Sequence, residues 1–70
     1  MQTNLRKLRK ERRLTQSELQ AAVGVDRTLI SKYETGERVP PVDVLVALAD
    51  YYGVSVDYIL RRTDKPELNQ

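Results

Sequence analysis

The sequence contains no cysteine and no histidine. Without cysteine the chain cannot form a disulfide, and without both residues a zinc site would have to be built from carboxylates alone. The same absence removes the commonest nucleophile and the commonest general base of enzymes. We therefore expect no enzyme, no metal site and no cofactor. With 70 residues the chain is one domain at most, and compact helix packing must stabilise it.

Long apolar runs are also missing from the sequence. No stretch approaches the roughly 18 consecutive apolar residues that would suggest a membrane-spanning helix. The basic N-terminal segment is not followed by the apolar region that a signal peptide contains. These absences predict a cytoplasmic protein with no membrane partner.

Charge is distributed unevenly along the chain. The formal net charge is +2, but residues 1–13 carry six basic side chains and one acidic one, whereas residues 14–70 carry six basic and nine acidic. A basic end suits a polyanion or an acidic membrane surface. The alternative is that these cations form a solvated face of the first helix, and charge alone is compatible with both interpretations.

Apolar residues recur at helical spacing along almost the whole chain, which predicts an all-α fold. The first expected helix spans about Thr3 to Arg13, and either Thr3 or Asn4 can cap its start. Leu14 lies in the break after this helix, and we expect its side chain to fill the core.

The second expected helix opens with Thr15 and Glu18, the spacing of a capping box, in which each side chain bonds to the backbone of the other residue. Gly24 ends this helix, because glycine tolerates the left-handed conformation of a helix exit. The apolar stripe between these two ends consists of Leu19, Ala22 and Val23.

Three further helices are expected after Gly24. Asp26 is a good N-cap for the third, which closes at Thr35 and Gly36, and the prolines of residues 37–41 exclude a helix interior there. A fourth helix is expected over about Val42 to Tyr52 with Gly53 as its end, and Ser55 caps a short fifth helix. The apolar residues of these helices are Ile30, Tyr33, Leu45, Val46, Leu48, Ala49, Tyr52, Tyr58, Ile59 and Leu60. Residues 61–70 are predicted to be a polar tail.

Residues 16–35 have the pattern of a helix-turn-helix: two capped helices joined by a short turn that contains glycine. On the second of these helices, Ile30 and Tyr33 are spaced to point inward. The opposite face carries two cations and no acid, and consists of Arg27, Thr28, Ser31, Lys32 and Thr35. Such side chains can donate hydrogen bonds to the edges of bases and to phosphates.

From Gln2 to Leu60 the chain resembles the Cro and repressor type of helix-turn-helix protein, the XRE family of bacterial and phage regulators. The matching residues are Leu14-Thr15-Gln16, Glu18-Leu19, Val23-Gly24-Val25, Ile30-Ser31, Tyr33-Glu34, Gly36, Pro40, Leu45, Leu48-Ala49 and Gly53-Val54-Ser55. The resemblance implies a five-helix, lambda-repressor-like DNA-binding domain over residues 1–60. It also implies a sequence-specific transcriptional regulator, expected to be a repressor, that binds double-stranded DNA as a homodimer. The operator would be pseudo-palindromic, with half-sites about one helical turn apart.

The resemblance further implies roles for individual residues. The edges of bases would be contacted by Arg27, Thr28, Ser31 and Lys32, and phosphates by Gln16, Ser17, Thr35, Arg38 and Arg12. Gln16 would also brace the recognition helix, and Glu34 would pair with Arg9. The alternative for Arg27 and Lys32 is a phosphate contact, and for the remaining polar residues it is a solvated position. Arg6 and Arg13 are likewise either backbone contacts or solvated.

Two residues depart from the family pattern. Gln20 stands where alanine is usual and where two helices cross closely, so its side chain must bend toward solvent or the crossing must open slightly. Pro41 stands where a capping serine is usual, and the fourth helix is expected to begin just after it.

The tyrosines suggest a dimer contact. Tyr52 fits the apolar stripe of the fourth helix, whereas Tyr51 and Tyr58 fit it less well, and aromatic residues are enriched in interfaces. An alternative function for the same fold is an antitoxin-like module whose main partner is a protein. An enzyme would need a nucleophile–base pair, a phosphate-binding loop or a metal cluster, and the sequence contains none of these patterns.

Overall fold

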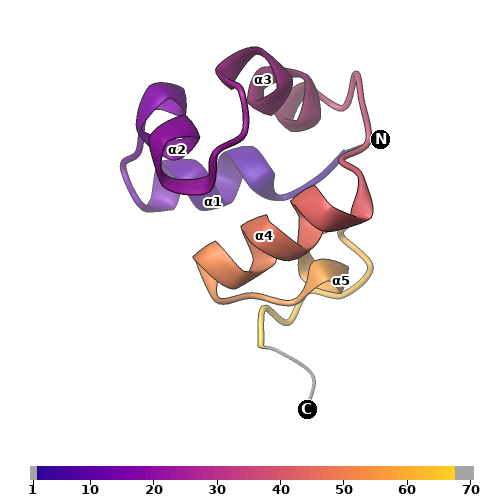
Figure 1. The fold of residues 1–70 in the computed structure, drawn as a ribbon. Helices are drawn as coiled ribbons and strands as arrows, with labels where there is room; N and C mark the ends of the chain where they lie inside the picture. Colours follow the sequence, from indigo (N-terminus) through magenta and orange to yellow (C-terminus); the bar gives the residue numbers. More distant parts are fainter. Residues whose placement is uncertain (1, 68–70) are drawn as a thin grey trace.

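The structure, a computed structural model, describes residues 2–67 of the chain, and in that range it contains five α-helices and no strand (Figure 1). The helices are α1 (Leu5–Glu11), α2 (Gln16–Val23), α3 (Arg27–Thr35), α4 (Val42–Tyr52) and α5 (Val56–Ile59). In Figure 1, α1 lies between the pair formed by α2 and α3 and the pair formed by α4 and α5. The expected all-α fold with five helices is confirmed. Within residues 2–67, no helix has the length and apolar character needed to cross a membrane.

One hydrophobic core joins all five helices. Its buried residues are Leu5, Leu8, Leu19, Ile30, Tyr33, Leu45, Leu48, Ala49, Tyr52, Val54, Tyr58 and Ile59. Leu14 packs against this core from the break after α1, as expected. Two residues of the predicted apolar stripes are exposed instead, Ala22 and Val46. Val46 follows Leu45 by about 100° around α4, which turns it away from the buried face, and the short α2 buries mainly Leu19 and Val23.

Local features explain where α2 begins and ends and where α4 begins. The Thr15 hydroxyl accepts from the Glu18 amide at 3.0 Å, and the Glu18 carboxylate accepts from the Thr15 amide at 2.9 Å, so the predicted capping box is present. These bonds hold the pKa of the Glu18 carboxyl below its usual value. Gly24 ends α2 in the left-handed conformation with φ of 73°. α4 begins directly after Pro41 and runs over the predicted residues.

Long-range contacts decide the bounds of α1, which is shorter at both ends than the prediction. The Asn4 side chain does not cap α1; it donates to the Tyr58 carbonyl at 2.7 Å, and the Asn4 amide donates to the Ile59 carbonyl at 2.9 Å. At the other end, Arg13 adopts a positive φ of 56°, which is incompatible with a continuing right-handed helix. The start of α1 is therefore attached to α5.

The predicted tail is hydrogen-bonded to the domain at both ends of its described part. The amides of Arg61 and Arg62 donate to the carbonyls of Tyr58 and Asp57 at 3.1 and 2.8 Å, and the Arg61 guanidinium donates to the Gln2 side-chain oxygen at 2.8 Å. The carbonyl of Pro66 accepts from the amide of Ser55 at 3.1 Å, next to the start of α5. The last residues of that predicted tail, 68–70, lie outside the described residues.

Candidate DNA interface

The junction between α2 and α3 is fixed by two side-chain caps on the first turn of α3. The Asp26 carboxylate accepts from the Thr28 amide at 2.9 Å, which confirms the predicted N-cap. The Gln20 side-chain oxygen accepts from the Arg27 amide at 2.7 Å. Gln20 is exposed, so its side chain does bend toward solvent and also bonds α2 to the first residue of α3. A residue that departs from the family pattern thus contributes to the angle between the two helices.

A bidentate ion pair attaches the second half of α3 to α1. The Arg9 Nε donates to Glu34 Oε2 at 2.7 Å, and Arg9 Nη2 donates to Glu34 Oε1 at 3.0 Å. The side chain of Glu34 is 3% exposed and that of Arg9 is 12% exposed. This hydrogen bonding raises the pKa of Arg9 further above its usual value, so its charge is permanent. The pair expected from the family resemblance is present in the structure.

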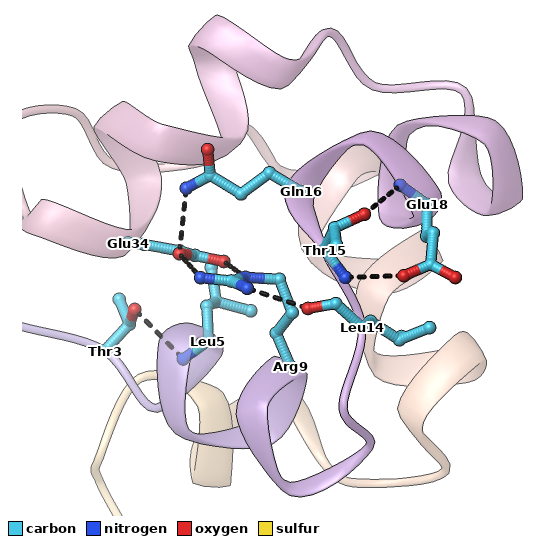
Figure 2. Close-up of polar contacts among 8 residues, drawn as sticks. All are labelled: Thr3, Leu5, Arg9, Leu14, Thr15, Gln16, Glu18 and Glu34. Atoms are coloured by element: carbon cyan, nitrogen blue, oxygen red, sulfur yellow. Dashed lines mark hydrogen bonds and ion pairs between the residues drawn. The ribbon is translucent and has the colours of Figure 1, made fainter.

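The same ion pair is extended to the start of α2. Figure 2 shows the side chains of Arg9, Gln16 and Glu34 directed toward one another between α1, α2 and α3. The Gln16 amide donates to Glu34 Oε1 at 3.2 Å, and Arg9 Nη1 donates to the Leu14 carbonyl at 2.8 Å. The expected bracing of α3 by Gln16 is therefore seen. Three helices are joined through one carboxylate, so the orientation of α3 is held from two sides.

The outward face of α3 carries the residues that sequence analysis assigned to base contacts. Arg27 and Thr28 are exposed, whereas Ser31 and Lys32 are half-buried. Ile30 and Tyr33 are buried on the opposite side, as predicted. Among the residues that the structure describes, the side chains of Thr28, Ser31 and Lys32 form no internal hydrogen bond or ion pair. Their polar groups are thus available to a partner molecule.

Polar residues lie beside both ends of this face. At one end, the Arg27 guanidinium donates to the Ser17 hydroxyl at 3.5 Å, a long contact that brings the first turn of α2 next to the first turn of α3. At the other end, the Arg38 amide donates to the Lys32 carbonyl at 3.2 Å, and the Thr35 hydroxyl donates to the same carbonyl at 3.2 Å. These bonds hold the loop after α3 against its last turn, and the Arg38 side chain remains exposed.

Arg12 does not have the free guanidinium expected of a phosphate contact. It donates to the Tyr52 carbonyl at 2.6 Å and to the Tyr51 carbonyl at 3.4 Å, at the C-terminal end of α4. It also lies 5.3 Å from the centre of the Tyr52 ring, within cation–π range. A cation at a helix C-terminus is favourable because the last carbonyls lack partners within the helix. Arg12 therefore has a structural role that the sequence did not indicate. Its side chain is exposed, as are those of Arg6 and Arg13, and its phosphate contact stays a prediction.

The prediction that Tyr58 is an exposed dimer contact is wrong. Tyr58 is 7% exposed and belongs to the core, and its hydroxyl accepts from Lys7 Nζ at 3.0 Å. Tyr51 is half-buried, and its ring packs edge-to-face on the Tyr52 ring with 5.2 Å between centroids. Tyr58 and Tyr52 thus stabilise the fold, whereas Tyr51 keeps part of its surface exposed, and its dimer contact stays a prediction.

Sequence reasoning missed the second roles of Gln20 and Arg12, because each contact depends on tertiary structure. Gln20 reaches Arg27 across a turn, and Arg12 reaches the end of α4, 40 residues away. Periodicity and capping rules relate only residues within a helical turn or two. The departure of Gln20 from the family pattern was the one signal that marked the position as unusual.

Comparison with known proteins identifies the same architecture. The sequence model of the helix-turn-helix family matches residues 5–59. The uncharacterized HTH-type transcriptional regulator YobD of Bacillus subtilis is 46% identical over 63 residues, which are 90% of this chain and 56% of that protein. The uncharacterized HTH-type transcriptional regulator YqaE of the same organism is 36% identical over 83% of this chain and 50% of its own length.

A third relative is named as a transcriptional activator. The HTH-type transcriptional activator BcrR of Enterococcus faecalis is 36% identical over 80% of this chain and 28% of its own length. The chain spans about half the length of YobD and YqaE. No solved structure matches the chain.

Proposed function

Because this chain belongs to the XRE-type helix-turn-helix family, whose members are transcriptional regulators and not enzymes, we propose that it recognises specific DNA sequences by placing α3 in the major groove. The observation that carries the proposal is the contrast between the two sides of α3. One side is held by the core, by the Arg9–Glu34 ion pair and by Gln16. The other side presents Thr28, Ser31 and Lys32, whose side chains form no hydrogen bond or ion pair with any other described residue, and the exposed Arg27, whose one such contact is long.

The chemistry of the outward face suits the edges of bases. A guanidinium can donate two hydrogen bonds to O6 and N7 of guanine, so Arg27 is the residue that we assign to the most selective contact. Lys32 supplies a point charge with less fixed geometry, and Thr28 and Ser31 supply hydroxyls that can donate or accept. A rigid helix is a suitable support for them, because direct readout requires side chains in fixed positions.

Residues beside this face would contact the DNA backbone. Gln16 and Ser17 lie on the first turn of α2, whereas Thr35 and Arg38 lie at the end of α3 and in the loop after it. Contacts at both ends of the recognition helix would fix its position along the groove without reading sequence. Gln16 would then have two functions, because its side-chain amide also donates to Glu34 Oε1.

Two copies would bind an inverted repeat, one recognition helix per half-site, in the cytoplasm where DNA is accessible. Half-sites would lie about one helical turn apart, since both helices must enter the groove on one face of the duplex. Where such a site overlaps a promoter, the bound dimer would exclude RNA polymerase and repress transcription. BcrR carries the name of an activator, so the position of the operator relative to the promoter would set the direction of regulation.

Selection of bound duplexes from a random DNA pool, at near-physiological salt, tests this function. We expect enrichment of an inverted repeat, and we expect the double variant Arg27→Ala/Lys32→Ala to lose the base preference within each half-site. The matched control is Arg6→Ala, which removes an exposed cation outside the proposed interface. Weak, salt-sensitive binding without enrichment of any sequence would contradict the proposal, because it would indicate electrostatic attraction alone.

A further inference from the structure

A polar hollow lies between the start of α1, the end of α5 and the segment that follows α5. Its volume is about 370 Å³, which is at the lower end of the range that small-molecule sites occupy. Three cations from two parts of the chain line it: Lys7 on α1, and Arg61 and Arg62 shortly after α5. One carboxylate, that of Asp64, is also among the lining residues. The hollow therefore carries an excess of positive charge.

The cations of this hollow keep hydrogen-bond donors that the fold does not use. The Arg62 side chain forms no hydrogen bond or ion pair with any other described residue. Lys7 Nζ donates to the Tyr58 hydroxyl at 3.0 Å, and Arg61 Nη1 donates to the Gln2 side-chain oxygen at 2.8 Å. An ammonium and a guanidinium each carry several N–H donors, so Lys7 and Arg61 also keep donors for a ligand.

Hydrogen bonds and an unusual turn hold the two sides of the hollow in place. The Asn4 side chain donates to the Tyr58 carbonyl at 2.7 Å, and the Arg62 amide donates to the Asp57 carbonyl at 2.8 Å. Arg61 adopts a φ of 62°, a left-handed conformation that residues with a Cβ rarely populate. Such strained conformations cluster at ligand-binding sites. The turn at Arg61 brings two successive guanidinium groups to one hollow.

We propose that this hollow binds a small anion that carries a phosphate group. The charges match, because the three lining cations and the Asp64 carboxylate give a net charge of +2. Guanidinium groups bind phosphate through paired hydrogen bonds, and Lys7 would add a point charge from α1. A phosphate group has three terminal oxygens, one more than a carboxylate, so it can accept from donors that come from separate segments of the chain.

The hollow lies away from the candidate DNA interface. In Figure 1, α3 and α5 lie on opposite sides of α1, and the hollow is on the side of α5. Its three cations are not among the residues to which we assign base or phosphate contacts. A bound anion would therefore leave the outward face of α3 accessible, and the proposal does not depend on the DNA-binding function proposed above.

Titration of the isotope-labelled chain with pyrophosphate, followed through its amide NMR signals at constant ionic strength, tests the site. We expect saturable shifts with one anion bound per chain, concentrated at the residues that line the hollow. Malonate, a small dicarboxylate, is the control anion and should not saturate over the same range. Equal saturation by malonate would overturn the assignment of a phosphate ligand. Shifts spread over the exposed cations Arg6 and Lys10 would overturn the site, because they would indicate electrostatic attraction alone.

Removal of one lining cation separates binding in the hollow from general attraction. Arg62→Ala should weaken pyrophosphate binding by at least about tenfold, the loss expected when a charge-assisted hydrogen bond is removed. Its thermal melting should match that of the wild type, because the Arg62 side chain forms no hydrogen bond or ion pair within the described residues. The matched control is Arg6→Ala, which removes an exposed arginine of α1 that does not line the hollow. Unchanged binding by Arg62→Ala, or equal weakening by Arg6→Ala, would overturn the proposal.

Removal of the lining carboxylate should have the opposite effect. Asp64→Asn takes away the one negative charge among the lining residues and should strengthen pyrophosphate binding by up to about fivefold, the range of a surface charge interaction. Weaker binding by Asp64→Asn would contradict an anionic ligand.

Addition of a DNA duplex distinguishes a free phosphate compound from the phosphates of DNA. A duplex bound by the chain already saturated with pyrophosphate should leave the shifted signals of the hollow in place. Displacement of pyrophosphate by the duplex would mean that these cations contact the DNA backbone, and would overturn the proposal. The pyrophosphate titration itself needs no DNA, so it decides the proposal even if the chain binds no duplex and the proposed function fails.

Discussion

Replacement of Arg9 by methionine would remove the ion pair that orients α3 and retain an unbranched side chain. The Glu34 side chain is 3% exposed, and in this variant its remaining polar partner would be the Gln16 amide at 3.2 Å. Removal of one member of a buried ion pair costs about 3–5 kcal/mol, because the other charge stays buried without compensation. Some solvent reaches Arg9, which is 12% exposed, so we expect the lower part of this range.

That loss is large for a chain of this size. At about 0.05–0.15 kcal/mol per residue, the total free energy of unfolding is about 4–10 kcal/mol. The Arg9→Met variant should therefore unfold at much lower urea concentration, measured by far-ultraviolet circular dichroism at pH 7. The matched control is Arg6→Met on the same helix, where the side chain is exposed and the change should stay within about 0.5 kcal/mol.

A double variant makes the test independent of whether Arg9→Met folds. Arg9→Met/Glu34→Leu removes both charges, and apolar replacement of a whole buried pair is often neutral or stabilising. The double variant should therefore be more stable than Arg9→Met alone, a strong departure from additivity. A loss below about 1 kcal/mol for Arg9→Met, or a double variant less stable than either single one, would refute the assigned role of the ion pair.

Three further expectations concern the interface and its caps. Arg27→Ala should relax base preference within the half-site, whereas Arg38→Ala should weaken binding to all sequences and flatten the salt dependence by about one unit of slope per phosphate contact. Equal losses on operator and random DNA for Arg27→Ala would exclude base reading. Gln20→Ala should lower the free energy of unfolding by about 0.5–1.5 kcal/mol, since the Arg27 amide loses its acceptor; urea titration would show it, and no change would mean that water replaces the cap. The hydrogen bonds to Thr15 lower the pKa of the Glu18 carboxyl. The ionised carboxylate should therefore stabilise the fold fully at a pH above the usual carboxyl pKa. This stabilisation should be lost as the pH falls through the lowered pKa of the folded state. Melting temperatures of the wild type and Glu18→Ala should then differ at pH 7 and converge toward pH 3, and a constant difference would contradict the assignment.

The ends of a helix could be predicted from the sequence where residues close to those ends determine them. The capping box at Thr15 and the left-handed glycines mark bounds that depend on a few neighbouring residues. The start of α1 depends instead on Asn4, whose side chain contacts Tyr58, 54 residues away. No local pattern distinguishes that use of asparagine from a helix cap, so the sequence does not show that the Asn4 side chain contacts α5 instead of capping α1.

The candidate interface was predictable in a different way. The outward face of α3 could be predicted from helical periodicity. Ile30 and Tyr33 are buried on one side of the helix, so the residues on the opposite side must point away from the core. The Arg9–Glu34 pair followed only from the family resemblance, since its members are 25 residues apart. The exposure of Val46 was mispredicted because an apolar side chain in an apolar helix was assigned to the core. Whether Val46 faces the core depends on how α4 is rotated about its own axis relative to the neighbouring helices. The amino-acid composition of α4 does not determine that rotation.

The basic character of α1 illustrates why charge alone is a weak guide to a DNA surface. Three of its cations are used within the fold: Lys7 on the Tyr58 hydroxyl, Arg9 on Glu34, and Arg12, directly after the helix, on the last carbonyls of α4. An N–H that donates to an internal acceptor cannot donate to a phosphate at the same time, so such a side chain is less available for a backbone contact. The concentration of positive charge in residues 1–13 therefore reflects the need of a small, cysteine-free domain for attachments between helices. Arg6, Lys10 and Arg13 remain exposed and can still attract DNA at long range, but the direct phosphate contacts that we propose for α3 and the loop after it do not depend on them.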